Sequence, residues 1–160
     1  MSGNRIGIGY DVHRLGGEGP LRLGGVEIAH DRGVIAHSDG DVLIHALMDA
    51  LLGAMAAGDI GQHFPDSDPA YAGASSLHLL AQVMGLVQSR GFRVVNVDAT
   101  IVCEAPRLAP HLPAMRQALD AVLACGVDAI GLKATTNEGL GAIGRGESIA
   151  VHAVALLASS

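Results

Sequence analysis

The segments RIGIGYDVH (residues 5–13) and DVLIHALMDALLGAM (residues 41–55) decide how the chain folds. In the first, Ile, Ile, Tyr and Val alternate with Gly, Gly, Asp and His, which is typical of a β-strand. The second repeats apolar residues at helical spacing, and Ser38, Asp39 or Asp41 is available to cap its first turn, so it predicts an α-helix.

The rest of the chain consists of short apolar segments separated by turn residues. Gly24 and Gly25 predict the turn of a β-hairpin over residues 21–28. The same reasoning predicts helices over residues 74–89 and 113–125, and strands over residues 94–102, 130–136 and 148–157. The last strand is ambiguous because alanine also favours helix. We expect one domain over residues 1–160, an α+β sandwich whose mixed or antiparallel β-sheet carries helices on one face.

The composition narrows the classes of function. Apolar residues make up 49% of the chain and charged residues only 16%, which indicates buried subunit interfaces. The net charge of −6 and the scarcity of aromatic residues argue against a nucleic-acid partner. No apolar run approaches the roughly 20 residues of a membrane span, and the first residues lack a signal-peptide pattern, so we expect a cytoplasmic protein with no membrane partner. Cys103 and Cys125 predict two reduced thiols.

Asp11 and His13 form the sharpest chemical signal. Residues i and i+2 of a strand point to the same face, so these two side chains can converge on one ion, and His45 can join them from the following helix. Two imidazoles and one carboxylate suit Zn²⁺, and three protein ligands leave a fourth position for substrate. The alternative is that Asp11 is a turn residue ending the strand and both histidines are ordinary surface or core groups.

Other polar residues flank this candidate site in the sequence. Asp41 and Asp49 lie one helical turn on either side of His45, and either can orient its imidazole or simply face solvent. His37 and Ser38 precede a helix N-terminus, where free N–H groups favour an anion, so they are candidate phosphate contacts. The same segment is also an ordinary capping sequence.

Loops after the helices and strands carry further candidates. Residues 59–69 are dense in carboxylates, which can bind a polyol or form a solvated loop rich in Asx turns. Residues 104–110 and 134–138 each leave a strand and can line a pocket, and Glu138 offers the hard oxygen ligand that Mg²⁺ or Mn²⁺ takes. Residues 139–146 lack the spacing of a Walker phosphate loop.

Six motifs, taken together, resemble one enzyme family. They are GYDVH at 9–13, AHSDGD at 36–41, GDIG at 58–61, FPDSD at 64–68, APR at 105–107 and KATTNE at 133–138. The chain resembles 2-C-methyl-D-erythritol 2,4-cyclodiphosphate synthase from Arg5 to Leu157. Ordered motifs over nearly the whole chain are far more specific than any one of them.

The resemblance implies a homotrimer of α+β subunits with active sites between adjacent subunits, which fits the apolar surplus. It implies a phosphorus–oxygen lyase of the non-mevalonate route to isoprenoids. The substrate, 4-diphosphocytidyl-2-C-methyl-D-erythritol 2-phosphate, is cyclised by attack of its 2-phosphate on the β-phosphorus, with release of CMP. The implied cofactors are Zn²⁺ at the Asp/His/His site and Mg²⁺ or Mn²⁺ bridging the substrate diphosphate.

The resemblance also implies roles for residues. The zinc ligands are Asp11, His13 and His45, and Glu138 helps to place the second ion. The transition-state stabilisers are His37 and Thr136. The methylerythritol-phosphate contacts are Ser38, Asp59, Ile60, Gly61, Phe64, Pro65, Asp66, Ser67 and Asp68. The cytidine pocket comprises Cys103, Glu104, Ala105, Pro106, Arg107, Leu108, Ala109 and Thr135. The remaining substrate contacts are Asp11, Val12, His13, His37, Thr136, Asn137, Glu138, Ala142 and Arg145.

Ala142 and Ile143 depart from the family pattern, in which an aromatic and a hydroxyl residue are common at these positions. The departure puts in doubt a substrate contact at Ala142. It also puts in doubt the cavity along the trimer axis that accepts an isoprenoid diphosphate in some members. Arg145 either binds phosphate or pairs with Glu147.

Two other functions compete with the cyclase. One is a non-catalytic trimeric sensor that binds cytidine nucleotides or isoprenoid diphosphates without turnover, against which the intact set of metal-ligating residues argues. The other is a zinc phosphoesterase that uses bound hydroxide and releases a linear phosphate. Metal analysis, a CMP-release assay and mass spectrometry of the product separate the three.

Overall fold

Helix α1 (Val42–Ala54) lies at the centre of the computed structural model, which describes residues 3–160. Almost every residue of α1 is buried, because the helix packs on strands β1 (Arg5–Glu18) and β7 (Ser148–Ser159) and on helix α3 (Ser76–Ser89). A helix that is apolar around its whole circumference is stable only when it is covered in this way.

Five strands form one mixed sheet within the described residues, in the order β4-β1-β7-β5-β6. β1 pairs antiparallel with β4 (Arg32–Ile35) and with β7. β7 also pairs antiparallel with β5 (Phe92–Val102), and β5 pairs parallel with β6 (Ile130–Thr135). The predicted α+β fold with a mixed sheet is confirmed.

A hairpin of β2 (Leu21–Leu23) and β3 (Val26–Ile28) forms a second, small sheet. Its turn residues Gly24 and Gly25 have φ angles of 59° and 74°, a conformation that favours glycine. The buried carboxylate of Asp41 accepts hydrogen bonds from both turn N–H groups (2.9 and 2.7 Å) and from the first turn of α1 (3.1 Å). Asp41 therefore caps α1 and ties it to the hairpin.

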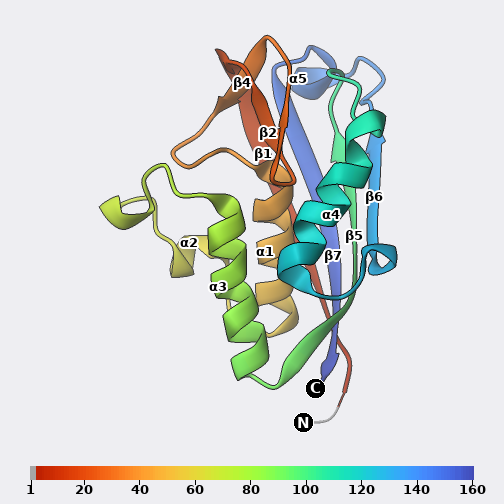
Figure 1. Cartoon of the computed structure of the whole chain (residues 1–160). Helices are drawn as coiled ribbons and strands as arrows, with labels where there is room; N and C mark the ends of the chain where they lie inside the picture. Colours follow the sequence, from red (N-terminus) through yellow and green to blue (C-terminus); the bar gives the residue numbers. More distant parts are fainter. Residues whose placement is uncertain (1–2) are drawn as a thin grey trace.

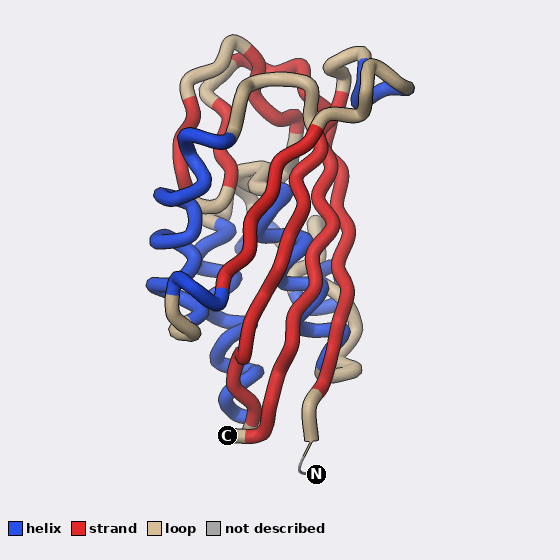
Figure 2. Tube along the Cα trace, turned by 90° about the vertical axis from the view of Figure 1, so that its right-hand side faces the viewer, coloured by secondary structure: helices blue, strands red, loops and turns tan. Residues whose placement is uncertain are grey.

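The longer helices, α1, α3 and α4 (Leu112–Leu123), lie on one face of the five-stranded sheet, which we call the inner face (Figures 1 and 2). The outer face carries no helix in the described chain (Figure 2). Large apolar side chains of β1 and β7 are exposed there: Ile6, Ile8, Tyr10, Val12 and Val154. No helix among residues 3–160 combines the length and the apolar character needed to cross a membrane.

The predicted elements are confirmed with shifted boundaries. β1 continues beyond His13 to Glu18, and the ambiguous C-terminal segment is a strand because it pairs with β1 on one side and β5 on the other. Both cysteines are free, as predicted. The pattern did not predict β4 or the short helical elements, which are too short for a periodicity. These are α2 (Ile60–His63), α5 (Gly141–Gly144) and the 3₁₀ turns Pro69–Tyr71, Ala109–His111 and Val127–Ala129.

Candidate functional site

Strand β1 and helix α1 run in opposite directions with matched repeats. A Cβ atom built on Gly7 would overlap the backbone of Ala50, and one built on Gly9 would overlap the backbone of Ala46. Two residues along a strand advance about 6.7 Å, and four residues along a helix advance about 6 Å. One further step therefore brings the next residue of this face, Asp11, beside the first turn of α1.

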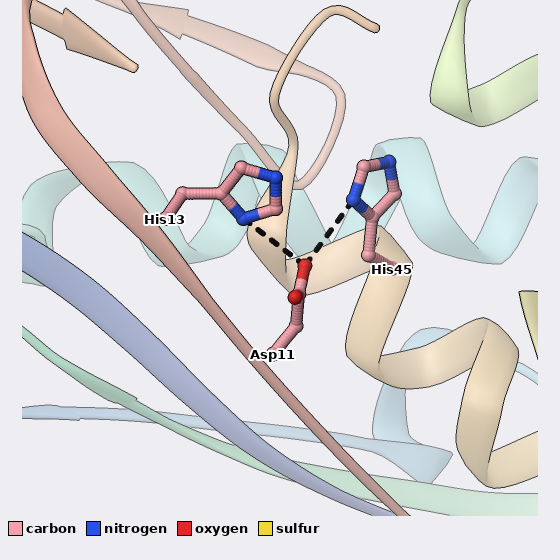
Figure 3. Close-up of side chains that lie close together, drawn as sticks. All are labelled: Asp11, His13 and His45. Atoms are coloured by element: carbon pink, nitrogen blue, oxygen red, sulfur yellow. Dashed lines mark hydrogen bonds and ion pairs between the residues drawn. The ribbon is translucent and has the colours of Figure 1, made fainter. Parts of the chain in front are cut away.

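Asp11, His13 and His45 converge at this point and form what we call the ligand cluster (Figure 3). Oδ2 of Asp11 lies 3.1 Å from Nδ1 of His13 and 3.2 Å from Nδ1 of His45. The three ligand atoms all lie within 4.8 Å of one another. Asp11 lies within β1 and does not end it, so the alternative of a terminal turn residue is wrong.

The ligand cluster fits a divalent metal ion. Nδ1 of His13 is buried and has no hydrogen-bond partner among residues 3–160, although Asp11 is close enough for an ion pair. A buried polar atom without a partner requires an explanation, and a lone pair directed at a metal provides one. A tetrahedral Zn²⁺ ion with bonds of about 2.0–2.1 Å separates its ligands by about 3.3–3.4 Å, close to the two O–N distances found here. The donor set, two imidazoles and one carboxylate, also suits zinc.

Electrostatics sets the charge of the cluster. Burial opposes the charged form of Asp11, but contacts with His13 and His45 outweigh burial and lower the pKa of Asp11 to about 2. Burial also opposes the charged form of His45, but Asp11, with smaller contributions from Asp41 and Asp39, raises the pKa of His45. Asp11 is thus ionised at neutral pH, as a metal ligand must be, and protons compete with a metal for His45.

Two hollows border the cluster. The His45 hollow, of about 50 Å³, is lined by His37, Ser38, His45, Met48, Ile60, Phe64, Asp66, Tyr71 and Leu79. The His13 hollow, of about 430 Å³, is lined by Val12, His13, Arg14, Leu15, Ala142, Glu147 and Ser148. The structure thus places several of the expected methylerythritol-phosphate contacts beside His45, and Val12 and Ala142 beside His13.

The carboxylates of the loop at residues 59–69 have two different roles. Asp59 caps α2 by accepting from a backbone N–H (3.0 Å), and Asp68 caps the next turn in the same way (2.9 Å). Asp66 instead lines the His45 hollow. The turn interpretation therefore holds for Asp59 and Asp68, and Asp66 is free to face a ligand. The other expected contacts of this loop, Gly61, Pro65 and Ser67, lie outside the lining of the hollow.

The residues expected to bind cytidine form a separate hollow. This Cys103 hollow, of about 270 Å³, is lined by Cys103, Glu104, Pro106, Arg107, Leu108, Ala109, Ala134, Thr135 and Thr136. Ala105 precedes Pro106 through a cis peptide bond. Burial, with the neighbouring Glu104, raises the pKa of Cys103 to about 11, so its thiol stays protonated and unreactive at neutral pH.

Buried core separates the Cys103 hollow from the ligand cluster. Asp11 pairs with Val151, Val151 with Ile101, and Ile101 with Ala134, so the two sites lie at the ends of one row of paired residues. Three strand spacings, about 14 Å, separate β1 from β6. Val151 and Ile101 are fully buried, so a ligand cannot run along the inner face from one site to the other within one chain.

Glu138 lies in the loop after β6, outside the ligand cluster. Its φ of 53° is in the left-handed region, which costs a residue other than glycine about 1–2 kcal/mol. Its N–H donates to Oγ1 of Thr136 (3.2 Å), and the side chain of Asn137 donates to the carbonyl of Leu140 (2.9 Å). Backbone strain of this kind recurs at ligand sites.

The guanidinium of Arg145 forms an ion pair with the carboxylate of Glu147. Nε donates to Oε1 at 2.8 Å and Nη2 donates to Oε2 at 3.3 Å. Of the two alternatives for Arg145, the pairing with Glu147 is the one that the structure contains.

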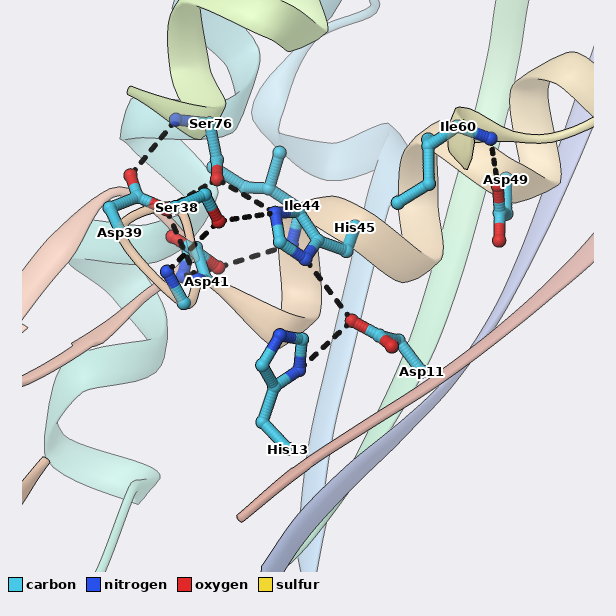
Figure 4. Close-up of polar contacts among 12 residues, drawn as sticks. Asp11, His13, Ser38, Asp39, Asp41, Ile44, His45, Asp49, Ile60 and Ser76 are labelled. Carbon is cyan, nitrogen blue, oxygen red and sulfur yellow. Dashed lines mark hydrogen bonds and ion pairs between the residues drawn. The ribbon is translucent and has the colours of Figure 1, made fainter. Parts of the chain in front are cut away.

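The hydrogen-bond partners of Nε2 of His45 are two serines that the sequence pattern did not connect with it (Figure 4). Nε2 of His45 lies 3.1 Å from Oγ of Ser76 and 3.4 Å from Oγ of Ser38. Asp41 and Asp49, which the sequence left either to orient His45 or to face solvent, bond elsewhere: Asp41 to the hairpin, and Asp49 to the first N–H of α2 (2.8 Å). No local signal identifies Ser76, because it lies 31 residues after His45 and begins a different helix.

Known proteins share this sequence and fold. Residues 4–158 match the YgbB family. The chain is 60% identical to the 2-C-methyl-D-erythritol 2,4-cyclodiphosphate synthase of Cyanothece sp. (strain PCC 7425 / ATCC 29141), over 99% of each chain. It is 59% identical to the protein of that name from Pseudomonas aeruginosa (strain UCBPP-PA14), over 96% of this chain and 98% of the relative.

Solved structures agree with these matches. The fold matches the CDP complex of IspF from Plasmodium falciparum with a TM-score of 0.88 at 31% identity, over 100% of this chain and 99% of that one. It matches the bifunctional IspDF from Campylobacter jejuni with a TM-score of 0.96 at 41% identity, over 100% of this chain and 43% of that one. On these grounds the chain belongs to the YgbB family, whose matched relatives are 2-C-methyl-D-erythritol 2,4-cyclodiphosphate synthases.

Proposed function

We propose that the protein converts 4-diphosphocytidyl-2-C-methyl-D-erythritol 2-phosphate to 2-C-methyl-D-erythritol 2,4-cyclodiphosphate with release of CMP, in non-mevalonate isoprenoid biosynthesis. The observation that carries the proposal is the convergence of Asp11, His13 and His45 in a chain 60% identical to a cyclodiphosphate synthase. Two similar structures are CDP-bound, which supports a cytidine diphosphate ligand.

The reaction is an intramolecular phosphoryl transfer. An oxygen of the 2-phosphate forms a bond to the β-phosphorus, the bond from the β-phosphorus to the bridging oxygen breaks, and CMP leaves with that oxygen. No side chain acts as a nucleophile. Catalysis therefore depends on positioning the two phosphates and on neutralising their charge.

The chain offers two places for divalent ions. Asp11, His13 and His45 would hold Zn²⁺, and Glu138 would help to hold Mg²⁺ or Mn²⁺ against the diphosphate. When bound, such ions supply Lewis-acid polarisation and charge neutralisation at phosphate oxygens. The depressed pKa of Asp11 keeps its carboxylate available at neutral pH.

The hollows divide the substrate between them. His37 and Ser38 line the His45 hollow, where they can donate hydrogen bonds to phosphate oxygens, and Asp66 can accept from a polyol hydroxyl. The Cys103 hollow would receive the cytidine, and Thr136 in its lining can donate to a phosphate. His37 and Thr136, which we expect to act on the same reacting group, line different hollows of one chain.

We therefore expect the complete site to form between adjacent subunits of a homotrimer. The buried residues between the two sites support this arrangement, because they leave no path along the inner face within one chain. The outer face supports it too: Ile6 and Ile8 are each 72% exposed, and a contiguous apolar patch marks an interaction surface. Ala142 and Ile143 depart from the family pattern, which argues against an isoprenoid diphosphate on the trimer axis.

The test incubates zinc-loaded protein with the diphosphocytidyl substrate and Mg²⁺, and follows CMP by chromatography and the second product by mass spectrometry. Cyclic diphosphate in equal amount to CMP is expected. A linear phosphate would instead indicate a phosphoesterase, and binding without CMP release would indicate a sensor. Asp11→Asn and His45→Gln should each lower the rate of CMP release by about 1,000-fold or more while the circular dichroism spectrum is unchanged.

A further inference from the structure

We propose that Ser76 and Asp39 form a hydrogen-bonded relay that fixes the tautomer and orientation of His45 for metal binding. The inference rests on the metal site of the proposed function and adds two positioning residues to it. Both act through His45, from outside the ligand cluster.

The two ring nitrogens of His45 face different surroundings (Figure 4). Nδ1 lies 3.2 Å from Oδ2 of Asp11, on the side of the ligand cluster, and Nε2 lies 3.1 Å from Oγ of Ser76. A neutral imidazole carries one proton, so one nitrogen donates and the other offers a lone pair. Nδ1 can bind a metal only when the proton is on Nε2.

Asp39 favours the proton on Nε2, and it acts through Ser76. The hydroxyl of Ser76 donates to Oδ1 of Asp39, and the backbone N–H of Ser76 donates to Oδ2 at 2.9 Å. A hydroxyl has a single proton, so Oγ of Ser76 can only accept from His45. In the neutral ring that a metal requires, Nε2 is then the donor and Nδ1 carries the lone pair, whereas in the metal-free protein a protonated Nδ1 donates to Oδ2 of Asp11.

Burial makes the relay selective. Ser76 is fully buried and His45 is only 8% exposed, so water has little access to the hydrogen bond between them. Ser38 is a weaker partner, because its Oγ lies 3.4 Å from Nε2 and already accepts from the N–H of Gly40 (3.3 Å). Ser76, the first residue of α3, is therefore the principal acceptor for His45.

The relay also joins three parts of the fold. Asp39 lies in the loop before α1, His45 lies in the first turn of α1, and Ser76 begins α3. Ser75, the N-cap of α3, makes no capping hydrogen bond with its side chain. Asp39, which is far from α3 in the sequence, instead accepts a hydrogen bond from the N–H of Ser76. The orientation of the metal ligand thus depends on how α3 docks against the start of α1.

The test compares zinc affinity in the full-length wild type and in Ser76→Ala, measured by competition with a chromogenic chelator on metal-free protein. Loss of a residue that orients a histidine ligand is expected to weaken zinc binding by about 10- to 100-fold. Ser75→Ala, a neighbouring exposed serine outside the relay, should bind zinc as the wild type does. Should Ser76→Ala fail to fold, Asp39→Asn tests the same relay, because it removes the anionic acceptor of the Ser76 proton.

A spectroscopic measurement separates positioning from a general loss of stability. Long-range ¹H–¹⁵N NMR of the zinc-loaded wild type should show His45 protonated at Nε2 with a slowly exchanging proton, and this proton should exchange faster in Ser76→Ala. Equal zinc affinity and an unchanged His45 signature in the variants would overturn the relay alone. A wild type that binds no zinc would overturn the proposed metal site, and the relay with it.

Discussion

The two faces of β1 invert the arrangement expected of a strand in an isolated domain. Its inner face carries two glycines followed by Asp11 and His13, and its outer face carries large apolar side chains from Ile6 to Val12. In most half-covered sheets the large apolar residues face the core and the polar residues face water. On the inner face of β1, helix α1 comes so close that only glycine fits, and one step further the strand presents metal ligands. The exposed apolar face of β1 is the surface that the proposed homotrimer would bury.

The glycines of the inner face provide the strongest test of this comparison. In Gly9→Ala the new methyl group would overlap the backbone of Ala46, so α1 would have to move, and we expect a loss of about 3 kcal/mol or more in unfolding free energy. Gly53→Ala is the matched control, because its nearest neighbour would be the carbonyl oxygen of Ile8 at an ordinary 3.7 Å. That variant should gain about 0.5–1 kcal/mol. Urea unfolding measures both, and equal effects would refute the close approach of strand and helix.

The outer face is tested with Ile8→Asp. If this face meets another subunit, a buried carboxylate there should weaken each interface by about 2 kcal/mol or more, and the protein should sediment as a monomer. The rate of CMP release should fall as the trimer is lost. Gln88→Asp, an exposed change on α3, should leave sedimentation unaltered. A trimer that survives Ile8→Asp would place the interface elsewhere.

The polar half of the inner face predicts opposite pH dependences with and without metal. The pKa of His45 is raised above 6.5, so its contribution to the stability of the metal-free protein is complete below pH 6.5 and is lost as pH rises through the raised pKa. Zinc needs the neutral imidazole, so below that pKa zinc affinity should instead rise by about tenfold per pH unit. Asp11, with a pKa of about 2, stays ionised throughout.

Thermal unfolding of metal-free protein and zinc competition titrations, both from pH 5.5 to 8.5, measure these two slopes. Asp11→Asn removes the carboxylate that raises the pKa of His45, so the loss of metal-free stability at rising pH should become smaller. If zinc affinity fell with rising pH, as the stability of the metal-free protein is expected to do, the assignment of His45 as a ligand would be contradicted.

The smallest expected effect comes from a complementation assay that combines the His45 hollow of one subunit with the Cys103 hollow of another. His37→Ala and Thr136→Ala should each be poorly active alone. When the two variants are co-expressed in equal amounts, random trimers place the two intact halves together in one of four ordered pairs. Activity should therefore recover to about one quarter of the wild-type value. No recovery would mean that one subunit supplies both residues to each site.

Much of the site could be predicted from short-range regularity. The alternation of β1 placed Asp11 and His13 on one face, and the three candidate caps before α1 included Asp41, which the structure shows to be the N-cap. The hydrogen-bond partners of Asp41 and Asp49 were not predictable. These partners lie in a hairpin turn and in α2, and spacing along a helix does not report contacts with other elements. Strand β4 was missed for a related reason, since only pairing with β1 makes it a strand.

By itself, the sequence determined which residues share a face of a strand or helix and which motifs resemble the cyclodiphosphate synthases, because both are properties of neighbouring residues and their order. The tertiary structure alone decided that α1 covers the glycine face of β1, that Ser76 and Asp39 stand behind His45, and that buried core separates the two groups of expected site residues. These contacts join segments far apart in the chain, and packing selects them because it brings close-fitting surfaces and buried polar groups together.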